Sequence, residues 1–474
     1  MNSKTTFIIN TTCLTIILFL SALLTKINII PTLLSISIYL ILLSTLSHIT
    51  ININDQNKSI KIIKNLFIIN LILLIISYVI AQITKYYLKI DNIEVCNILL
   101  SLSISFHYIF KIIDTSFKTK ISTSSSYYII ITILTTISTL IIYLTNIKDT
   151  LSNIILCTIP LISGIINILL ITFLNKSHLT SLLEKRTTPS SNKIFTNNIY
   201  ISFINVINST YLYISLVYIY YLLNNVYNYN TYIIKSLITN TYLYGYLLLT
   251  ISINIIIYIL SNKYNINNNT KLLNNISTIY YKIFIILIPI IICIIMLSSP
   301  IWTLIFNNNK YSYILIGLAI YLFFYILYFL TIKLLNKINN KKNIVKILLI
   351  GLLFKILFTK SVISSFYRMG YPLVLGELIS TTLSYIVVII IGNYILKKKY
   401  NITFFTSIEK ILNIIYNNII LMVELILLGI FVKMKHINRI NALLVIIIYS
   451  IASILLYAIR LYISKNKDLE KRKE

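Results

Sequence analysis

Apolar runs of about 20 residues recur along the whole chain and are separated by short polar connectors. Runs of this length can cross a hydrocarbon core about 30 Å thick as single helices. The chain has 58% hydrophobic and only 11% charged residues, whereas a soluble domain carries about a quarter charged residues. There is too little charge to cover a soluble surface. The sequence therefore predicts an all-α polytopic membrane protein.

Fourteen runs are long enough to span a membrane. The predicted spans are 6–25, 29–49, 63–84, 94–115, 125–145, 151–174, 197–223, 232–260, 279–299, 312–334, 344–366, 371–396, 406–432 and 440–463. The first run, preceded by Lys4, lacks the small-residue cleavage site of a signal peptide and is expected to be a retained helix.

The most polar long interval, 175–198, divides these runs into six before it and eight after it. We expect an N-terminal six-helix bundle in 1–175, a linker in 176–196, a C-terminal six-helix bundle in 197–400, and two additional helices with a basic tail in 401–474. Two similar bundles facing each other across a membrane are the layout of an alternating-access transporter.

Basic residues are concentrated in the connectors that follow even-numbered spans. Such connectors include Lys58, Lys61 and Lys64, the central linker, and Lys397 to Lys399. Because Lys and Arg are enriched in cytoplasmic loops, both termini and the linker are predicted to be cytoplasmic, in a plasma-membrane protein. The alternation supports fourteen spans.

The net charge of +29 does not indicate a nucleic-acid partner, because the Lys residues lie in loops rather than on one patch of a folded domain. The four cysteines are scattered without a CxxC or Cys/His spacing, so no metal site is predicted. Walker A, HExxH and GxSxG motifs are absent from the sequence. We therefore expect no cofactor and no enzymatic activity, with membrane lipids as partners. The oligomeric state is left open, with a monomer expected.

Ionisable residues within membrane spans are costly and are candidate functional groups. His107, Lys111 and Asp114 share one face of the fourth span, because their spacings of four and three return to the same side of a helix. This face either lines a cavity or holds a structural Lys111–Asp114 bridge near the cytoplasmic end.

Lys355 lies near the middle of the eleventh span, too deep to reach the interface easily. A cation there suits an anionic substrate such as a pyrophosphate, or else pairs with an acidic neighbour. Glu377 in the twelfth span and Glu424 in the thirteenth are the embedded acids of the second half. Either one could neutralise Lys355 or bind a coupling proton or cation.

The Tyr- and Asn-rich segment Tyr211 to Tyr232 ends at the predicted outer interface. Because Tyr is favoured where one end of the ring is wet and the other apolar, we expect an interfacial belt. A surface on which a ligand stacks is the alternative.

Three pieces of the second half carry a family resemblance: PIWTLIF (Pro300 to Phe306), NKKNIVKILLIGLLFKILF (Asn340 to Phe358) and GELISTTLSY (Gly376 to Tyr385). In order and spacing, the stretch resembles the polysaccharide exporters of the MATE-like superfamily, which includes the stage V sporulation protein B and MurJ lipid II flippase groups.

The resemblance implies two six-helix bundles related by a pseudo-twofold axis, a central cavity that opens to each side in turn, and a groove for a lipid tail formed by the last two helices. It also implies that a polyprenyl-pyrophosphate-linked sugar moves from the inner to the outer leaflet. Two departures are evident. Glu377 replaces a small residue of the family-like motif, and the family's first-half basic residues cannot be placed here, so none is carried over.

The leading hypothesis is a flippase for lipid II or a polysaccharide repeat unit, with Lys355, Lys111, His107, Asp114, Glu377 and Glu424 as candidate cavity residues. A MATE-type cation-coupled antiporter is the alternative, although the first span lacks the acidic residue common in drug exporters. A membrane glycosyltransferase or polymerase is a third reading. Short outward loops with few carboxylates, Asp91 and Glu94 among them, argue against it.

Overall fold

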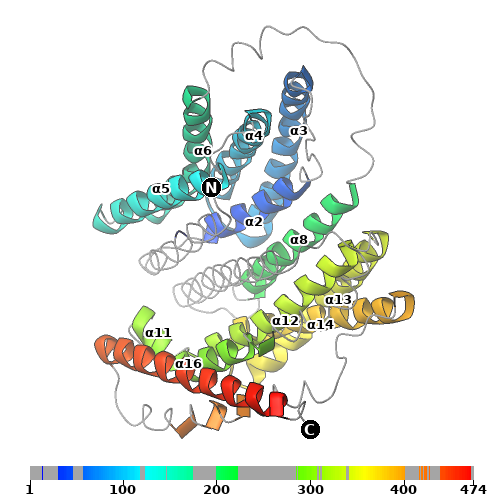
Figure 1. Cartoon of the computed structure of the whole chain (residues 1–474). Coiled ribbons are helices and arrows are strands. Elements are labelled where there is room, and N and C mark those ends of the chain that lie inside the picture. Colours follow the sequence, from blue (N-terminus) through cyan, green and yellow to red (C-terminus); the bar gives the residue numbers. More distant parts are fainter. Residues whose placement is uncertain are drawn as a thin grey trace. The chain divides into compact units, whose positions relative to one another are not determined.

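A computed structural model gives the fold. It describes residues 13, 30–45, 57–117, 123–145, 147–174, 199–222, 284–285, 287–306, 309, 312–337, 341–400, 416, 418–419, 421–423, 426–427 and 438–470. Every regular element in these ranges is a helix (Figure 1). The predicted spans 6–25, 232–260 and 406–432, and with them Glu424, fall largely or wholly outside the described residues.

The chain divides into two compact units. The first comprises 1–255 and 340–361, and the second comprises 256–339 and 362–474. One helix, α13 (Lys341–Arg368), belongs to the first unit over most of its length and to the second at its C-terminal end. These units do not test the predicted division into two six-helix bundles and two added helices, which stays a prediction.

The first unit is built from seven helices in the described part of the chain, α13 included. The other six are α2 (Ile30–Thr45), α3 (Asn57–Leu88), α4 (Ile93–Phe117), α5 (Thr123–Thr145), α6 (Asp149–Leu174) and α8 (Ile199–Tyr221). Helix α4 packs against α2, α3 and α6, and α2 also packs against α8. The core between these helices contains Leu34, Ile38, Leu100 and Cys157, all nearly or fully buried.

The second unit contains α11 (Ser298–Phe306), α12 (Tyr313–Lys337), α14 (Leu373–Tyr400) and α16 (Arg439–Glu470). Helix α12 packs along α14, and α11 packs against α16. The segments Leu287–Met296 and Ser298–Leu304 meet at an angle of 67°. Pro300 lies just after this break, and a proline lacks the N–H that would bond the carbonyl four residues earlier, so it accounts for the bend.

Most observed helices match the predicted spans within about four residues at each end, but α3 begins six residues earlier than predicted, α16 ends seven residues later, and the predicted span 279–299 corresponds to a bent pair that extends to Phe306. In the described part of the chain, seven helices are long and apolar enough to cross a membrane, or eight if the bent pair counts as one span. The remaining predicted spans there correspond to shorter apolar helices, Ile30–Thr45, Ile93–His107 and Ile129–Thr145. The chain is a multi-pass helical membrane protein, and a total of about fourteen helices agrees with this architecture.

Polar residues fit into these helices because their hydroxyl groups bond backward to the helix itself. Ser37 donates to the carbonyl of Leu34, and Thr331 donates to that of Leu327. This satisfies the hydroxyl without a neighbouring helix. The outward faces are strongly apolar, with Ile75 of α3 and Ile448 of α16 both more than 60% exposed. Apolar surface of this extent indicates contact with lipid rather than water.

Candidate functional site

Lys355 is the most unusual residue of the membrane interior that the structure describes. It lies on α13 and is 0% exposed, the largest side chain among those that are fully buried. Fourteen residues separate it from Lys341 at the start of the helix, a rise of about 21 Å. The sequence prediction that this lysine lies deep within a span is consistent with that position.

The ammonium group of Lys355 contacts α8, a helix more than 130 residues earlier in the chain. Its Nζ donates to the backbone carbonyl of Tyr211 at 3.0 Å and to the hydroxyl oxygen of Ser215. The same Nζ lies 5.2 Å from the centre of the Tyr211 ring. Tyr211 and Ser215 are four residues apart, so both lie on the face of α8 that meets α13. All of these residues belong to the first unit.

This arrangement explains how a cation can be accommodated in an apolar environment. A buried charge is very costly unless hydrogen bonds and nearby electron density compensate it. The carbonyl, the hydroxyl and the aromatic face provide that compensation with neutral groups. One turn further along α13, the Thr359 hydroxyl donates to the Lys355 carbonyl. An anionic ligand could therefore take the place of these neutral groups as the partner of the lysine.

Glu377 is also buried, at 1% exposure, but it lies in the second unit. Its Oε1 accepts a hydrogen bond of 2.7 Å from Thr381, one turn later on α14. The same unit contains a group of buried tyrosines in which the hydroxyl groups of Tyr321 and Tyr385 lie 3.3 Å apart. A pairing of Glu377 with Lys355 stays a prediction, as does any role of Glu424.

The candidate stripe His107, Lys111 and Asp114 lies on α4, as predicted. His107 is half-buried, close to a point where α4 and α6 approach each other closely. There, a Cβ added to Gly164 would lie 2.9 Å from the Cβ of Phe106. The side chains of Lys111 and Asp114 fall outside the described residues, so the choice between cavity lining and a structural bridge stays open to experiment.

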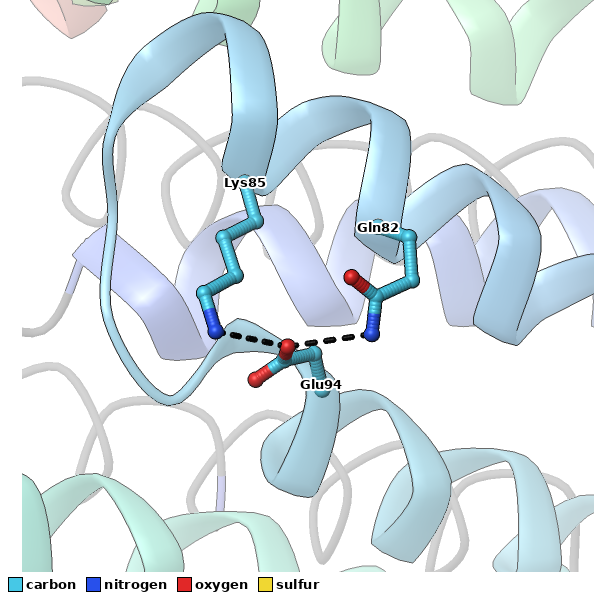
Figure 2. A network of polar contacts seen from close by, with 3 residues as sticks. All are labelled: Gln82, Lys85 and Glu94. Atoms are coloured by element: carbon cyan, nitrogen blue, oxygen red, sulfur yellow. Dashed lines mark hydrogen bonds and ion pairs between the residues drawn. The ribbon is translucent and has the colours of Figure 1, made fainter.

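The connection between α3 and α4 is fixed by a polar network (Figure 2). Lys85 forms an ion pair of 2.7 Å with Glu94, and Gln82 donates to the same carboxylate oxygen at 3.0 Å. The tight turn between the helices places Lys89 and Asn92 at positive φ angles of 52° and 63°. The ion pair therefore joins the last turn of α3 to the first turn of α4 across a short connection.

Sequence reasoning missed the partners of Lys355. Tyr211 was noted only as the start of a predicted interfacial belt, whereas it is 3% exposed and faces α13. The only available signal was a small polar residue, Ser215, one turn after a tyrosine in an apolar run. Such pairs are too common in this Tyr- and Ser-rich chain to identify a contact.

Neither a protein-family model nor a curated protein matches the sequence. The structure, however, is similar to a solved structure described as "Lipid II flippase MurJ, inward closed conformation", with a TM-score of 0.68 and 17% sequence identity. The match covers 98% of this chain and 100% of that chain. This chain therefore has the fold of a lipid II flippase MurJ structure, which confirms the predicted class of all-α polytopic membrane protein.

Proposed function

We propose that this protein is a flippase that moves a polyprenyl-pyrophosphate-linked sugar, lipid II or a polysaccharide repeat unit, from the inner to the outer leaflet by alternating access. The observation that carries the proposal is the fold match over 98% of the chain to a lipid II flippase structure.

We assign to Lys355 the binding of the pyrophosphate. In the observed state its ammonium is bound by neutral acceptors on α8. Phosphate oxygens are charged acceptors, and hydrogen bonds to them are roughly twice as strong as neutral ones. When α13 and α8 separate during the transport cycle, a pyrophosphate can replace Tyr211 and Ser215 as the partner of the ammonium. The contacts to α8 then re-form after release.

The remaining candidates take subsidiary roles in this proposal. On the α4 stripe, Lys111 adds positive charge for the same substrate and His107 adds a hydrogen-bonding group. The acids Asp114, Glu377 and Glu424 would repel a pyrophosphate, so we assign them to charge pairing or to a coupling cation. The distribution of basic loops supports cytoplasmic termini, and in this proposal the pyrophosphate enters the cavity from the cytoplasmic side.

The test is depletion of the protein in its own cells, followed by assay of polyprenyl-linked sugars on each leaflet. Accumulation of one precursor on the cytoplasmic side would support the flippase and identify its substrate. Re-expression of the unmodified protein must then restore the outer-leaflet pool. Unchanged precursors on both leaflets would contradict the proposal and direct attention to ion-coupled antiport through Glu377 or Glu424.

A further inference from the structure

A cavity of about 450 Å³ lies in the first unit, at the ends of two of its helices and beside a third. It is lined by the last residues of α3 and of α8 and by Lys360 of α13. The residues involved are Ile83, Thr84, Tyr87, Leu88, Tyr213, Val217, Tyr218, Tyr221, Leu222 and Lys360. The proposed function does not use this cavity.

The cavity lies at the depth of a membrane interface. The apolar windows that could span a membrane end at Leu88 in α3 and at Tyr221 in α8, and both residues line the cavity. Lys360 of α13 lies eight residues before the end of its own window at Arg368, about 12 Å along the helix, so it is deeper than those two residues. The ends of α3 and α8 therefore place the mouth of the cavity at the level of lipid headgroups, with Lys360 below it.

One positive charge faces this site. Lys360 is exposed and makes no hydrogen bond or ion pair with any residue that the structure describes. By contrast, the hydroxyl groups of Thr84 and Tyr213 bond each other at 2.9 Å, joining α3 to α8 in the cavity wall. Nothing in the described lining is acidic. The site therefore offers an available cation and would attract an anion.

The rest of the lining is suited to an amphiphile. Tyr87 and Tyr221 are 64% and 44% exposed, so their rings lie at the mouth, where Tyr is favoured between water and hydrocarbon. The aliphatic side chains of Ile83, Val217 and Leu222 provide an apolar wall beside the lysine. A small soluble anion would leave this wall uncovered, whereas a lipid covers it with the first part of its chain.

We infer that this cavity binds the phosphate-bearing headgroup of a membrane lipid, with Lys360 as the cation for the phosphate and the apolar wall against the lipid chain. Two sources share this chemistry: an anionic glycerophospholipid of the bulk membrane and a polyprenyl monophosphate. The inference does not rest on the flippase proposal, because it concerns binding at a site that the transport step does not use.

The experiment uses the full chain in phosphatidylcholine vesicles, with Tyr221→Trp as a fluorescent reporter at the mouth. Quenching by brominated phosphatidylglycerol is compared with quenching by brominated phosphatidylcholine, after subtraction of the signal from Trp302. A lysine near a membrane surface favours an anionic lipid by about fivefold. We expect that preference in the reporter protein, its loss in Lys360→Gln and its retention in Lys360→Arg.

Lys346→Gln is the matched control, since Lys346 is an exposed lysine near the opposite end of the same helix. It must leave the preference unchanged. Unlabelled phosphatidylglycerol and polyprenyl monophosphate are then added as competitors, and the one that displaces the brominated lipid at the lower concentration identifies the source. Equal quenching by both brominated lipids, a preference that survives Lys360→Gln, or no displacement by either competitor would overturn the inference. The assay measures binding without transport, so its failure would not count against the flippase.

Discussion

The ammonium of Lys355 and the backbone carbonyl of Tyr211 lie 3.0 Å apart, although 144 residues separate them in the chain. This contact joins α13 to α8 inside the membrane region through the side chain of a fully buried lysine. The backbone carbonyl of Tyr211 remains whatever side chain is placed at this position. The interaction must therefore be tested from the lysine and from Ser215, the second acceptor.

Replacing Lys355 by Met is expected to reduce the outer-leaflet delivery of the lipid-linked sugar by about tenfold or more. Met keeps most of the side-chain volume but removes the charge-assisted bonds to the pyrophosphate, each worth about 1.5–3 kcal/mol. Transport is measured by the leaflet assay in depleted cells that express the variant, with its amount in the membrane determined in parallel. Lys346→Met, an exposed position on the same helix, is the control. If Lys355→Met delivered the lipid-linked sugar to the outer leaflet at the normal rate, this lysine would have no role in transport.

Ser215→Ala should lower the thermal stability of the purified protein. The substitution leaves the buried ammonium with one acceptor fewer, and an unsatisfied buried group costs about 1–3 kcal/mol. Ser209→Ala in the same helix is the matched control, because the Ser209 hydroxyl bonds only the Asn205 carbonyl among the contacts that the structure describes.

The two serine variants are compared in the native background and in Lys355→Met. The cost of Ser215→Ala should shrink once the ammonium is gone, since the two residues interact directly. The cost of Ser209→Ala should not change. Equal costs for Ser215→Ala in both backgrounds would contradict the hydrogen bond.

Gly376→Ala is expected to destabilise the second unit. A Cβ at this position would lie 2.8 Å from the Cα of Ile363, a backbone atom of α13 that cannot move aside by changing a rotamer. Overpacking of this kind costs about 1–3 kcal/mol, more than Ala gains over Gly in a helix. The melting temperature of the purified protein measures the effect.

Gly317→Ala is the comparison for Gly376→Ala. Its added methyl group would meet Cδ1 of Leu375, the end of a flexible side chain that can turn away. We therefore expect Gly317→Ala to be close to neutral, or stabilising through helix propensity. A larger loss for Gly317→Ala than for Gly376→Ala would show that the helices approach each other differently.

A cysteine at Asp91 should react from outside the cell with a membrane-impermeant thiol reagent, whereas a cysteine at Lys342 should react only after permeabilisation. Both positions are exposed. Asp91 lies between the third and fourth predicted spans, and Lys342 lies between the tenth and eleventh. The prediction follows from the concentration of basic residues in cytoplasmic loops. Cys13, Cys96 and Cys157 are buried but Cys293 is partly exposed, so both cysteines are introduced into a Cys293→Ser background to keep background labelling low. The reverse pattern of labelling would place the termini outside.

Much of the helical layout could be read from hydropathy. The predicted span 344–366 corresponds to α13 at Lys341–Arg368, and 371–396 corresponds to α14 at Leu373–Tyr400. Agreement is close because the length of an apolar run is a local property that the thickness of the membrane selects. The embedded charges Lys355 and Glu377 were identified for a similar reason, since an ionisable residue within such a run is conspicuous without any knowledge of its neighbours.

The partners of those charges depended on tertiary structure. Hydropathy does not say which face of α13 meets α8, so neither Tyr211 nor Ser215 could be assigned to Lys355 in advance. Gly376 belonged to a recognisable motif, yet its role as a point of close approach to Ile363 emerges only from the packing of α14 on α13. The cavity beside Lys360 likewise requires the ends of α3 and α8 to lie next to α13.

Hydropathy and residue type alone indicate the class of the protein, the approximate bounds of its spans and the ionisable residues within them. These properties follow from the cost of placing polar groups in hydrocarbon, which acts on each segment separately. The contact of Lys355 with α8, the cavity beside Lys360 and the close approach of two helices at Gly376 are visible only in the folded structure. Those outcomes depend on contacts between segments far apart in the chain, because helix packing selects faces and distances that no single segment encodes.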